Sequence, residues 1–164
     1  MTQLFTYQVT VKDEWLDHNN HMNDAEYNRV FSNATDEYLA YLGLSEAEIE
    51  CRHYTVFTLE NHETYQKEVN KDEDLTVTVQ LVDHDAKRLH AFMTLYDQAQ
   101  DVCATYEVML MGIDTNSGRP APFPEDIAQN IEQDAELVDK EGLDQPKELG
   151  RQIGIKRKKI RTIQ

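Results

Sequence analysis

Alternating apolar and polar residues at the start of the chain predict a β-strand over residues 4–12. Apolar residues then recur at steps of three and four from Tyr27 to Leu42, which is the spacing of one face of a helix. Gly43 follows directly and can adopt the left-handed conformation that ends many helices. We therefore expect a strand, a polar loop and one long helix within the first 43 residues.

Strand patterns dominate the next part of the chain. A short helical or irregular link over residues 45–53 leads to a long, bent strand over residues 54–69. Alternation over residues 75–81 and 89–95 predicts two further strands, and the sequence "DHDAK" between them has the composition of a hairpin turn. We expect these two strands to pair with each other.

Residues 102–114 are apolar on both faces, as expected of a central strand. Glycine and prolines in "NSGRPAPFPED" then end the sheet, and a weaker, acidic helical pattern follows over residues 124–138. The order of strand, long helix and four strands predicts an α+β domain in which an antiparallel sheet wraps one helix. One helix leaves other apolar positions uncovered, so we expect a homodimer or homotetramer.

Length and charge divide the chain unequally. With 164 residues, 40% of them hydrophobic, the chain can form one domain with a sizeable core, which we place at residues 1–138. Residues 139–164 form a basic C-terminal tail. From Lys147 to Gln164 there are seven basic residues against one acid, a net charge of +6, which leaves −21 on the remainder. Such a tail is either a solvated end or an arm that contacts phosphate or another subunit.

The formal net charge of −15 argues against a nucleic-acid partner, because phosphate neutralisation requires a basic face. No apolar run approaches the roughly 20 residues of a membrane span, and the first ten residues lack the pattern of a signal peptide. Cys51 and Cys103 have neither the number nor the spacing of a disulfide framework. We expect a cytoplasmic protein with reduced cysteines and no membrane partner.

The polar stretch "WLDHNNHMNDAEY", residues 15–27, carries the candidate chemistry. Asn23 precedes the helical stripe and Glu26 follows three residues later, a variant of the capping box. A helix beginning here directs unpaired N–H groups and its positive dipole end into the loop. The amide of Asp24 could then hold a carbonyl oxygen while Asp17 attacks or activates water. The alternative for Asp17 is an ordinary turn acid that accepts backbone hydrogen bonds.

Two other chemistries have weaker support. Asp17, His18 and His21 have the atoms of a metal site but lack a cysteine pair or a His-Glu-x-x-His helix. No Gly-x-Ser-x-Gly elbow supports a serine nucleophile. We therefore expect neither a metal nor a cofactor.

Residues 17–27 resemble the segment "D-x-x-G-H-V/M-N-N-x-x-Y" of the 4-hydroxybenzoyl-CoA-thioesterase-like branch of hotdog-fold enzymes, within a matching element order over residues 4–115. The resemblance implies a hotdog fold, one long helix wrapped by an antiparallel sheet of about five or six strands. It also implies acyl-CoA hydrolysis in a dimer or dimer of dimers with sites at subunit interfaces.

The same resemblance implies roles for individual residues. The carboxylate matching Asp17 acts as nucleophile or general base, and the amide matching Asp24 polarises the thioester carbonyl. His21 would orient Asp17 or the loop, and Asn23 would cap the helix and position water. Two positions depart from the pattern, because Asn20 replaces the usual glycine and Asp24 replaces the second asparagine. Both substitutions bear on the geometry and charge of the loop.

Three pieces, "DHNNHMNDAEYNRVFS", "NSGRPAPFP" and "LGRQIGI", resemble the betainyl-CoA thioesterases of bacterial carnitine degradation, including those fused to carnitine dehydrogenase. The resemblance implies a quaternary-ammonium acyl group, with glycine betaine and CoA as products. Such a group cannot donate hydrogen bonds and requires aromatic faces and nearby negative charge. The candidates for substrate binding are Trp15, Asn20, Tyr27, Tyr54, Phe57 and Tyr65, with Glu60 or Glu63 as charge partner. Tyr27 and Phe57 are alternatively core residues, and Trp15 an interface anchor.

Phosphates of CoA require local basic residues in so acidic a chain, and the candidates are Lys87, Arg88, Arg119 and the tail. Other functions stay open at this point. They are a thioesterase for another short or aromatic acyl-CoA, a non-catalytic acyl-CoA-binding protein and a hotdog hydratase. Acidic charge and the absence of a helix-turn-helix segment argue against a DNA-binding sensor.

Overall fold

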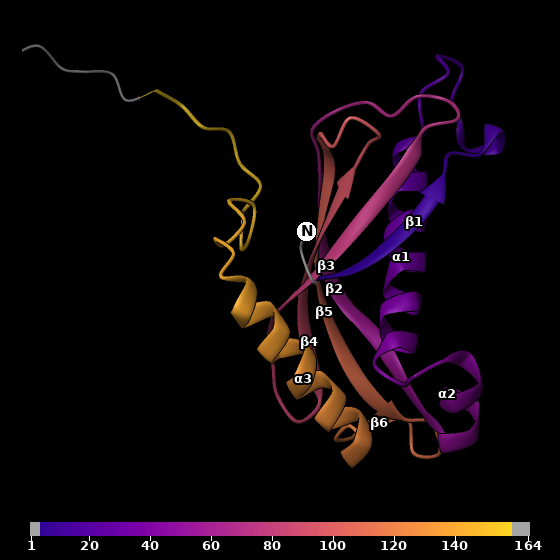
Figure 1. Cartoon of the computed structure of the whole chain (residues 1–164), viewed down its shortest axis with the longest axis vertical. Helices are drawn as coiled ribbons and strands as arrows, with labels where there is room; N and C mark the ends of the chain where they lie inside the picture. Colours follow the sequence, from indigo (N-terminus) through magenta and orange to yellow (C-terminus); the bar gives the residue numbers. More distant parts are fainter. Residues whose placement is uncertain (1–3, 159–164) are drawn as a thin grey trace, which may run out of the picture.

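The computed structural model describes residues 4–158 and contains one sheet with three α-helices (Figure 1). The first elements are β1 (Phe5–Thr10), a 3-10 helix η1 (Asp13–Trp15), α1 (Asp24–Tyr41) and α2 (Glu46–Arg52). The later elements are β2 (Tyr54–Tyr65), β3 (Asp74–His84), β4 (Arg88–Tyr96), β5 (Val102–Asp114), β6 (Arg119–Pro120) and α3 (Glu125–Glu141). Within the described part of the chain, no helix has the length and hydropathy needed to cross a membrane.

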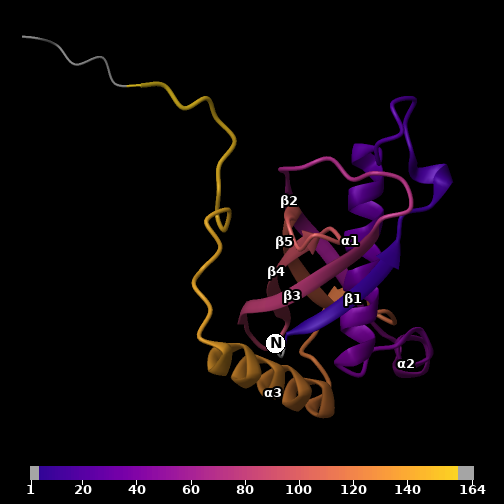
Figure 2. The ribbon, with the colours of Figure 1, turned by 45° about the horizontal axis from the view of Figure 1, so that its top comes forward.

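The sheet is antiparallel, with strand order β1-β3-β4-β5-β2, and the short β6 pairs with β5. It curls around α1, as Figure 2 shows. Strand β2 bends where its register shifts between Thr58 and Glu60, as a β-bulge does. The predicted architecture, one long helix wrapped by a sheet of five or six strands, is confirmed.

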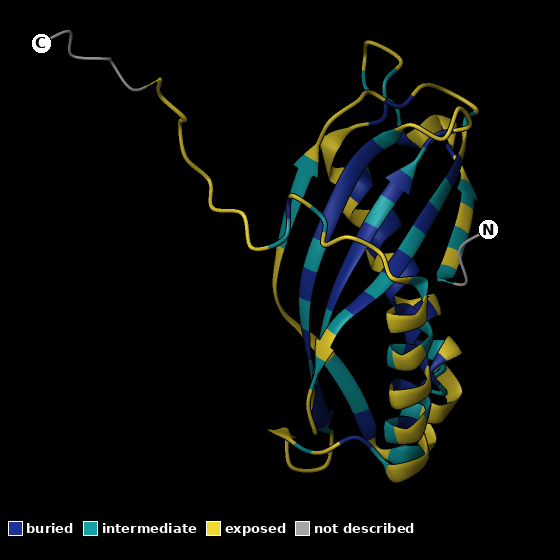
Figure 3. Cartoon of the chain, turned by 60° about the vertical axis from the view of Figure 1, so that its left-hand side comes forward, coloured by how far each residue is buried: buried dark blue, intermediate teal, exposed yellow. Residues whose placement is uncertain are grey.

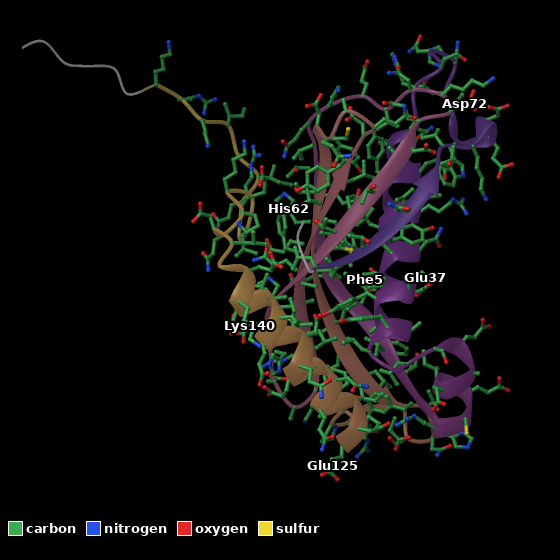
Figure 4. All side chains as sticks on the ribbon, in the orientation of Figure 1. Phe5, Glu37, His62, Asp72, Glu125 and Lys140 are labelled. Carbon is green, nitrogen blue, oxygen red and sulfur yellow. The ribbon has the colours of Figure 1, made fainter. Side chains whose placement is uncertain are left out.

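The core lies between α1 and the concave face of the sheet. Val30, Phe31, Ala34 and Tyr38 on α1 are completely buried, which confirms the predicted helical stripe. The ring of Phe31 stacks on Tyr106 of β5 with centroids 4.9 Å apart. At the other end of α1, Phe5 of β1 packs against the rings of Tyr38 and Tyr41, with centroids 5.6 and 5.1 Å away (Figure 4). Burial of this apolar face fixes the direction of α1, and with it the position of the loop before it.

Gly43 ends α1 in the predicted manner, with φ of +105°. A methyl group at this position would also lie 2.7 Å from Ile127 Cδ1 on α3. Two requirements therefore meet at one residue: a left-handed backbone and close approach of a second helix.

Helix α3 packs against β3 and the carboxyl end of α1 through Ile127, Ile131 and Val138. The side-chain amide of Asn130 donates to Leu42 O at 2.9 Å. The helix continues to Glu141, so the boundary predicted at residues 138 and 139 falls inside it.

Residues 143–151 then cross the face of the sheet that lies opposite α1 (Figure 3). The Gln66 side chain donates to Glu148 Oε1 at 2.9 Å, and Gly150 N donates to Glu107 Oε1 at 2.6 Å. The first part of the predicted basic tail is therefore a strap held to the sheet by these two hydrogen bonds rather than a free end. Its later basic residues Lys159 and Arg161 lie outside the described residues.

Candidate active site

The loop before α1 is a tight turn that backbone hydrogen bonds stabilise. Leu16 and Met22 form an isolated β-bridge, and inside it Asp17 N donates to His21 O at 2.8 Å. Asn20 at the tip has φ of +61° and donates its N–H to Asp17 O at 3.1 Å. Asparagine is among the few residues other than glycine that adopt this left-handed conformation at low cost. The replacement of the usual glycine therefore leaves the turn intact.

The turn fixes the carboxylate of Asp17. Its Oδ1 accepts hydrogen bonds from the backbone N–H groups of Asn19 at 2.8 Å and His21 at 3.2 Å. These two bonds hold the pKa of the Asp17 carboxyl below its ordinary value of 3.8, so the group is ionised at neutral pH. Both interpretations of Asp17 thus apply in part, because a turn acid accepting backbone bonds is also a positioned carboxylate.

Asn23 caps α1 as predicted and leaves one amide of the first turn without a partner. Its Oδ1 accepts from Ala25 N at 3.1 Å, and its carbonyl accepts from Glu26 N at 2.9 Å. Within residues 4–158 the N–H of Asp24, the first residue of the helix, has no hydrogen-bond acceptor. This free donor sits at the positive end of the helix dipole.

The second hydrogen bond of the predicted capping box, from the Asn23 N–H to the Glu26 side chain, is wrong. The backbone N–H of Asn23 donates to Trp15 O at 2.9 Å, so it is satisfied from outside the helix. The carboxylate of Glu26 instead pairs with Arg29 Nε at 2.6 Å along the helix surface. The side-chain cap therefore comes from Asn23, and Asp24 Oδ1 also accepts from Ala25 N at 3.0 Å.

A single depression of about 660 Å³ brings the motif together at the start of α1. Asp17, His21, Asn23, Asp24 and Tyr27 all line it, as does the segment 65–68 that follows β2. This volume lies within the range of small-molecule sites. A positioned carboxylate and a free helix-start amide in one depression suit reactions in which negative charge develops on a carbonyl oxygen.

Trp15, predicted to contact substrate, lies elsewhere. Its side chain is 5% exposed and belongs to the core, with Lys12 Nζ 5.5 Å from the ring centroid. It does not line the depression. Its contribution to the site is its carbonyl, which accepts the N–H of Asn23.

Other predicted contact residues are also outside the depression of this chain, namely Asn20, Tyr54, Phe57 and the two glutamates Glu60 and Glu63. Tyr54 begins β2, at the end far from the site, and is buried with its hydroxyl donating to Ala121 O at 2.9 Å. Phe57 lies in the first half of β2 with 53% of its surface exposed. Asn20 is exposed and shapes the turn through its backbone.

His21 directs its ring away from the predicted partner. Nε2 lies 3.3 Å from Glu68 Oε2, whereas the link to Asp17 is through the His21 backbone N–H. Among residues 4–158 there is no cluster of three or more histidine, cysteine, aspartate or glutamate side chains placed to hold a metal ion.

The sequence indicated Tyr65 as a contact residue but did not indicate residues 66–68, which also line the depression. The ring of Tyr65 meets Tyr27 edge to face, with centroids 5.2 Å apart and planes at 83°. Lys67 is the lysine of the lining, and its Nζ pairs with Asp97 at 2.6 Å and Asp101 at 2.8 Å. The aromatic character of Tyr65 was the available signal, whereas nothing in the sequence indicated Lys67.

Glu63 lies beside Tyr65 on the side of β2 that faces α1. Its Oε2 accepts from the Tyr65 hydroxyl at 2.6 Å, and its Oε1 is buried. Burial raises the pKa of Glu63, and the hydrogen bond from Tyr65 lowers it in part. By contrast Glu60 lines a separate hollow with His62 and Glu107, so the structure distinguishes the two glutamates.

The basic residues considered for CoA phosphates are not in the depression. Lys87 and Arg88 belong to the hairpin between β3 and β4, where Arg88 pairs with Asp85 at 2.6 Å, and Arg119 lies in β6. These residues are near the start of β2 and the end of β5, away from the depression. A role for them in this chain's own depression is therefore not supported.

Comparison with known proteins places the site in context. The model of the thioesterase-like superfamily matches residues 11–131, which include the loop, α1 and the sheet from β2 to β6. A betainyl-CoA thioesterase of Pseudomonas aeruginosa is 37% identical over 153 residues, which cover 93% of this chain and 95% of that protein. An L-carnitine dehydrogenase/betainyl-CoA thioesterase of Rhizobium meliloti is 34% identical over 148 residues, 90% of this chain but 29% of that longer protein.

Solved structures agree with these matches. A hypothetical protein of Staphylococcus aureus, solved in complex with CoA, superimposes with a TM-score of 0.90 at 40% identity and covers 95% of this chain and 98% of its own. A putative thioesterase of Pseudomonas putida gives a TM-score of 0.82 at 31% identity, over 96% of this chain and 100% of its own.

Proposed function

This chain belongs to the thioesterase-like superfamily, and from that premise we propose that it hydrolyses betainyl-CoA to glycine betaine and CoA. The observation that carries the proposal is the free Asp24 N–H and the ionised Asp17 in one depression. The acyl group is supported by the Pseudomonas aeruginosa relative, and CoA by the CoA complex of the Staphylococcus aureus protein. An acyl-CoA substrate and two unpaired cysteines, Cys51 and Cys103, support a cytoplasmic location.

The proposed reaction uses the two halves of the depression together. The thioester oxygen accepts a hydrogen bond from Asp24 N–H, which stabilises the negative charge that develops as the carbonyl carbon is attacked. Asp17 either attacks that carbon, forming an anhydride that water then cleaves, or takes a proton from the attacking water. The carbon–sulfur bond breaks and CoA leaves as a thiolate, a weak base that takes up a proton.

Two neighbouring residues position these groups. Asn23 determines where α1 begins, and therefore where the Asp24 N–H points. His21 holds Asp17 through its backbone N–H, and its ring fixes the loop to Glu68 at 3.3 Å. Neither role requires the side chain to touch the substrate.

Free-thiol release tests the function directly. The purified protein is offered betainyl-CoA, the neutral isostere 3,3-dimethylbutanoyl-CoA and benzoyl-CoA, and we expect the highest kcat/KM with betainyl-CoA. Preference for either other substrate would assign the chain to another short or aromatic acyl-CoA. Binding of CoA thioesters without thiol release would identify a non-catalytic acyl-CoA-binding protein.

Asn23→Ala tests the link between the cap and the chemistry. Loss of the cap is expected to lower the free energy of unfolding by about 1 kcal/mol. A displaced Asp24 amide is expected to lower kcat about tenfold or more, because small errors in a positioned donor are costly. Urea unfolding and thiol release measure the two effects.

The matched control is Ser45→Ala, which removes the cap of α2, where the Ser45 hydroxyl accepts from Glu48 N at 3.3 Å. It should cost similar stability and leave kcat unchanged. Equal kcat in the two cap variants would show that the start of α1 does not take part in the reaction.

We also propose that two copies of the chain associate through β2. This strand is an edge of the sheet, and it carries Phe57, Leu59 and Tyr65, whose exposed fractions are 53%, 52% and 53%. A long edge strand with apolar side chains favours pairing with another strand. Antiparallel pairing of β2 with its symmetry mate would cover these residues and bring both depressions to the interface.

Leu59→Lys is expected to shift the protein from dimer to monomer and raise the dissociation constant about tenfold or more, because a charge on the edge opposes strand pairing. Sedimentation velocity over a range of concentrations measures the change. Ile153→Lys is the control, since Ile153 is 92% exposed and lies beyond the strap. An unchanged dimer in Leu59→Lys would exclude β2 as the interface.

A further inference from the structure

Glu63 presents an unusual environment for a carboxylate. Its Oε1 is buried and has no hydrogen-bond partner among residues 4–158. A buried acceptor left unpaired costs about 1–3 kcal/mol, and more when it is charged. Such a group in a native fold requires an explanation, and functional use is one of the few available.

The other oxygen of Glu63 connects it to the depression. The hydroxyl of Tyr65 donates to Oε2 at 2.6 Å and lies 3.4 Å from Asp24 O, at the start of α1. A phenol that donates to a carboxylate gains electron density, which strengthens the attraction of its ring for a cation. The ring of Tyr65 lines the depression, and Tyr27 stands against it edge to face.

The charges that line the depression also favour a cationic ligand. Asp17, Asp24 and Glu68 line it, and Lys67 is already paired with two aspartates. The surroundings are therefore negative, which favours a cationic acyl group over an anionic one.

Tyr65 also lies next to the residue that would bind the thioester oxygen. Tyr65 reaches the carbonyl of Asp24, the residue whose N–H is the donor for the thioester oxygen. In betainyl-CoA a single methylene separates the trimethylammonium from the thioester carbonyl. Because Asp24 and Tyr65 line one depression, a substrate bound at Asp24 N–H places its cation in the same depression as the ring.

We propose that Tyr65, with the buried Tyr27 packed against it, supplies the face that binds the quaternary ammonium of the acyl group, and that Glu63 selects it by acting through Tyr65 as a positioning residue. The proposal rests on the proposed function of this depression. It excludes Glu60, which lines the separate hollow, and Trp15, which does not line the depression.

The test compares a charged substrate with a neutral substrate of the same shape. Glu63→Gln keeps an acceptor for the Tyr65 hydroxyl and removes the charge. We expect it to lower the ratio of kcat/KM for betainyl-CoA to that for 3,3-dimethylbutanoyl-CoA about tenfold, mainly through KM. Tyr65→Leu, which removes the ring, should lower the same ratio. Glu60→Gln is the matched control on the same strand and should leave the ratio unchanged.

A measurement on the unaltered protein keeps the test independent of variant folding. Choline should inhibit hydrolysis competitively, at a concentration about tenfold lower than its neutral isostere 3,3-dimethyl-1-butanol. Equal inhibition by the two compounds, or equal losses on both substrates in Glu63→Gln, would overturn the proposal while leaving the thioesterase function intact. Failure of the unaltered protein to release thiol from betainyl-CoA would instead overturn the proposed function.

Discussion

Asp17→Asn is expected to lower kcat for thioester hydrolysis on the order of 10³- to 10⁵-fold while the fold is retained. Asparagine keeps an Oδ1 that can accept from the N–H groups of Asn19 and His21, so the turn survives. It removes the negative charge, and with it the capacity to attack a carbonyl or to accept a proton from water. The same loss is expected whether Asp17 is nucleophile or general base.

Thiol release measures this loss, and urea unfolding verifies the fold. Glu14→Gln provides the control, because Glu14 is an exposed acid three residues upstream and does not line the depression. It should retain the full rate. Full activity of a folded Asp17→Asn protein would remove Asp17 from the chemistry and transfer the role of base to another acid of the depression.

The positions of the Asp17 carboxylate and of the Asp24 amide could be predicted because both are local in sequence. Asp17 and Asp24 are seven residues apart, and Asn23 marks the helix start through a side-chain bond that depends only on its own first turn. The stripe from Tyr27 to Leu42 is equally local, and its residues are buried except Tyr41, which is 49% exposed. The turn and the cap close within this stretch, and the bond from Met22 N to Val69 O at 2.9 Å then ties the stretch to the segment after β2.

The errors occurred where proximity in sequence was taken as proximity in space. Trp15 is two residues from Asp17, yet its side chain points into the core. Glu26 is at the correct spacing for a capping box, but Arg29 is one turn away and pairs with it. A competing partner of opposite charge decides such cases, and spacing alone does not reveal which partner prevails.

The residues on the far wall of the depression could be identified only from the fold. The segment 65–68 is about forty residues from Tyr27, and it reaches the start of α1 only because β2 pairs with β5 in one register. That register determines that Glu63 and Tyr65 share the face toward α1. A shift of one residue would have turned both away.

The basic tail shows a limit of charge patterns. The surplus of positive charge predicted a separate tail, but residues 143–151 are held by an acid and a backbone amide, Glu148 and Gly150. Those contacts do not depend on net charge, so composition could not indicate them.

Tyr38→Phe is expected to lower the free energy of unfolding by about 2–4 kcal/mol, through the contact that joins α1 to α3. The Tyr38 hydroxyl donates to Asp134, and both side chains are buried. Burial raises the pKa of Asp134, and hydrogen bonds from Tyr38 and Tyr41 lower it in part. Without the Tyr38 hydroxyl, the ionised carboxylate keeps its desolvation cost and loses a principal donor.

The pH dependence separates this cause from simple loss of packing. The hydroxyl stabilises the ionised form, so its removal raises the pKa of Asp134 further in the folded state. The folded protein then binds its proton more tightly than the unfolded chain, and the deficit of Tyr38→Phe shrinks as the pH falls and Asp134 becomes neutral. Urea unfolding at pH 7 and at pH 4 measures both deficits.

The same substitution in an Asp134→Asn background should cost about 1 kcal/mol, because a neutral amide needs the donor less. A cost that is equal in both backgrounds and at both pH values would mean that Tyr38 stabilises the α1–α3 junction by packing alone. The predicted coupling instead requires Asp134 to have a structural role. Among the acidic residues of α3, it is the one buried against α1.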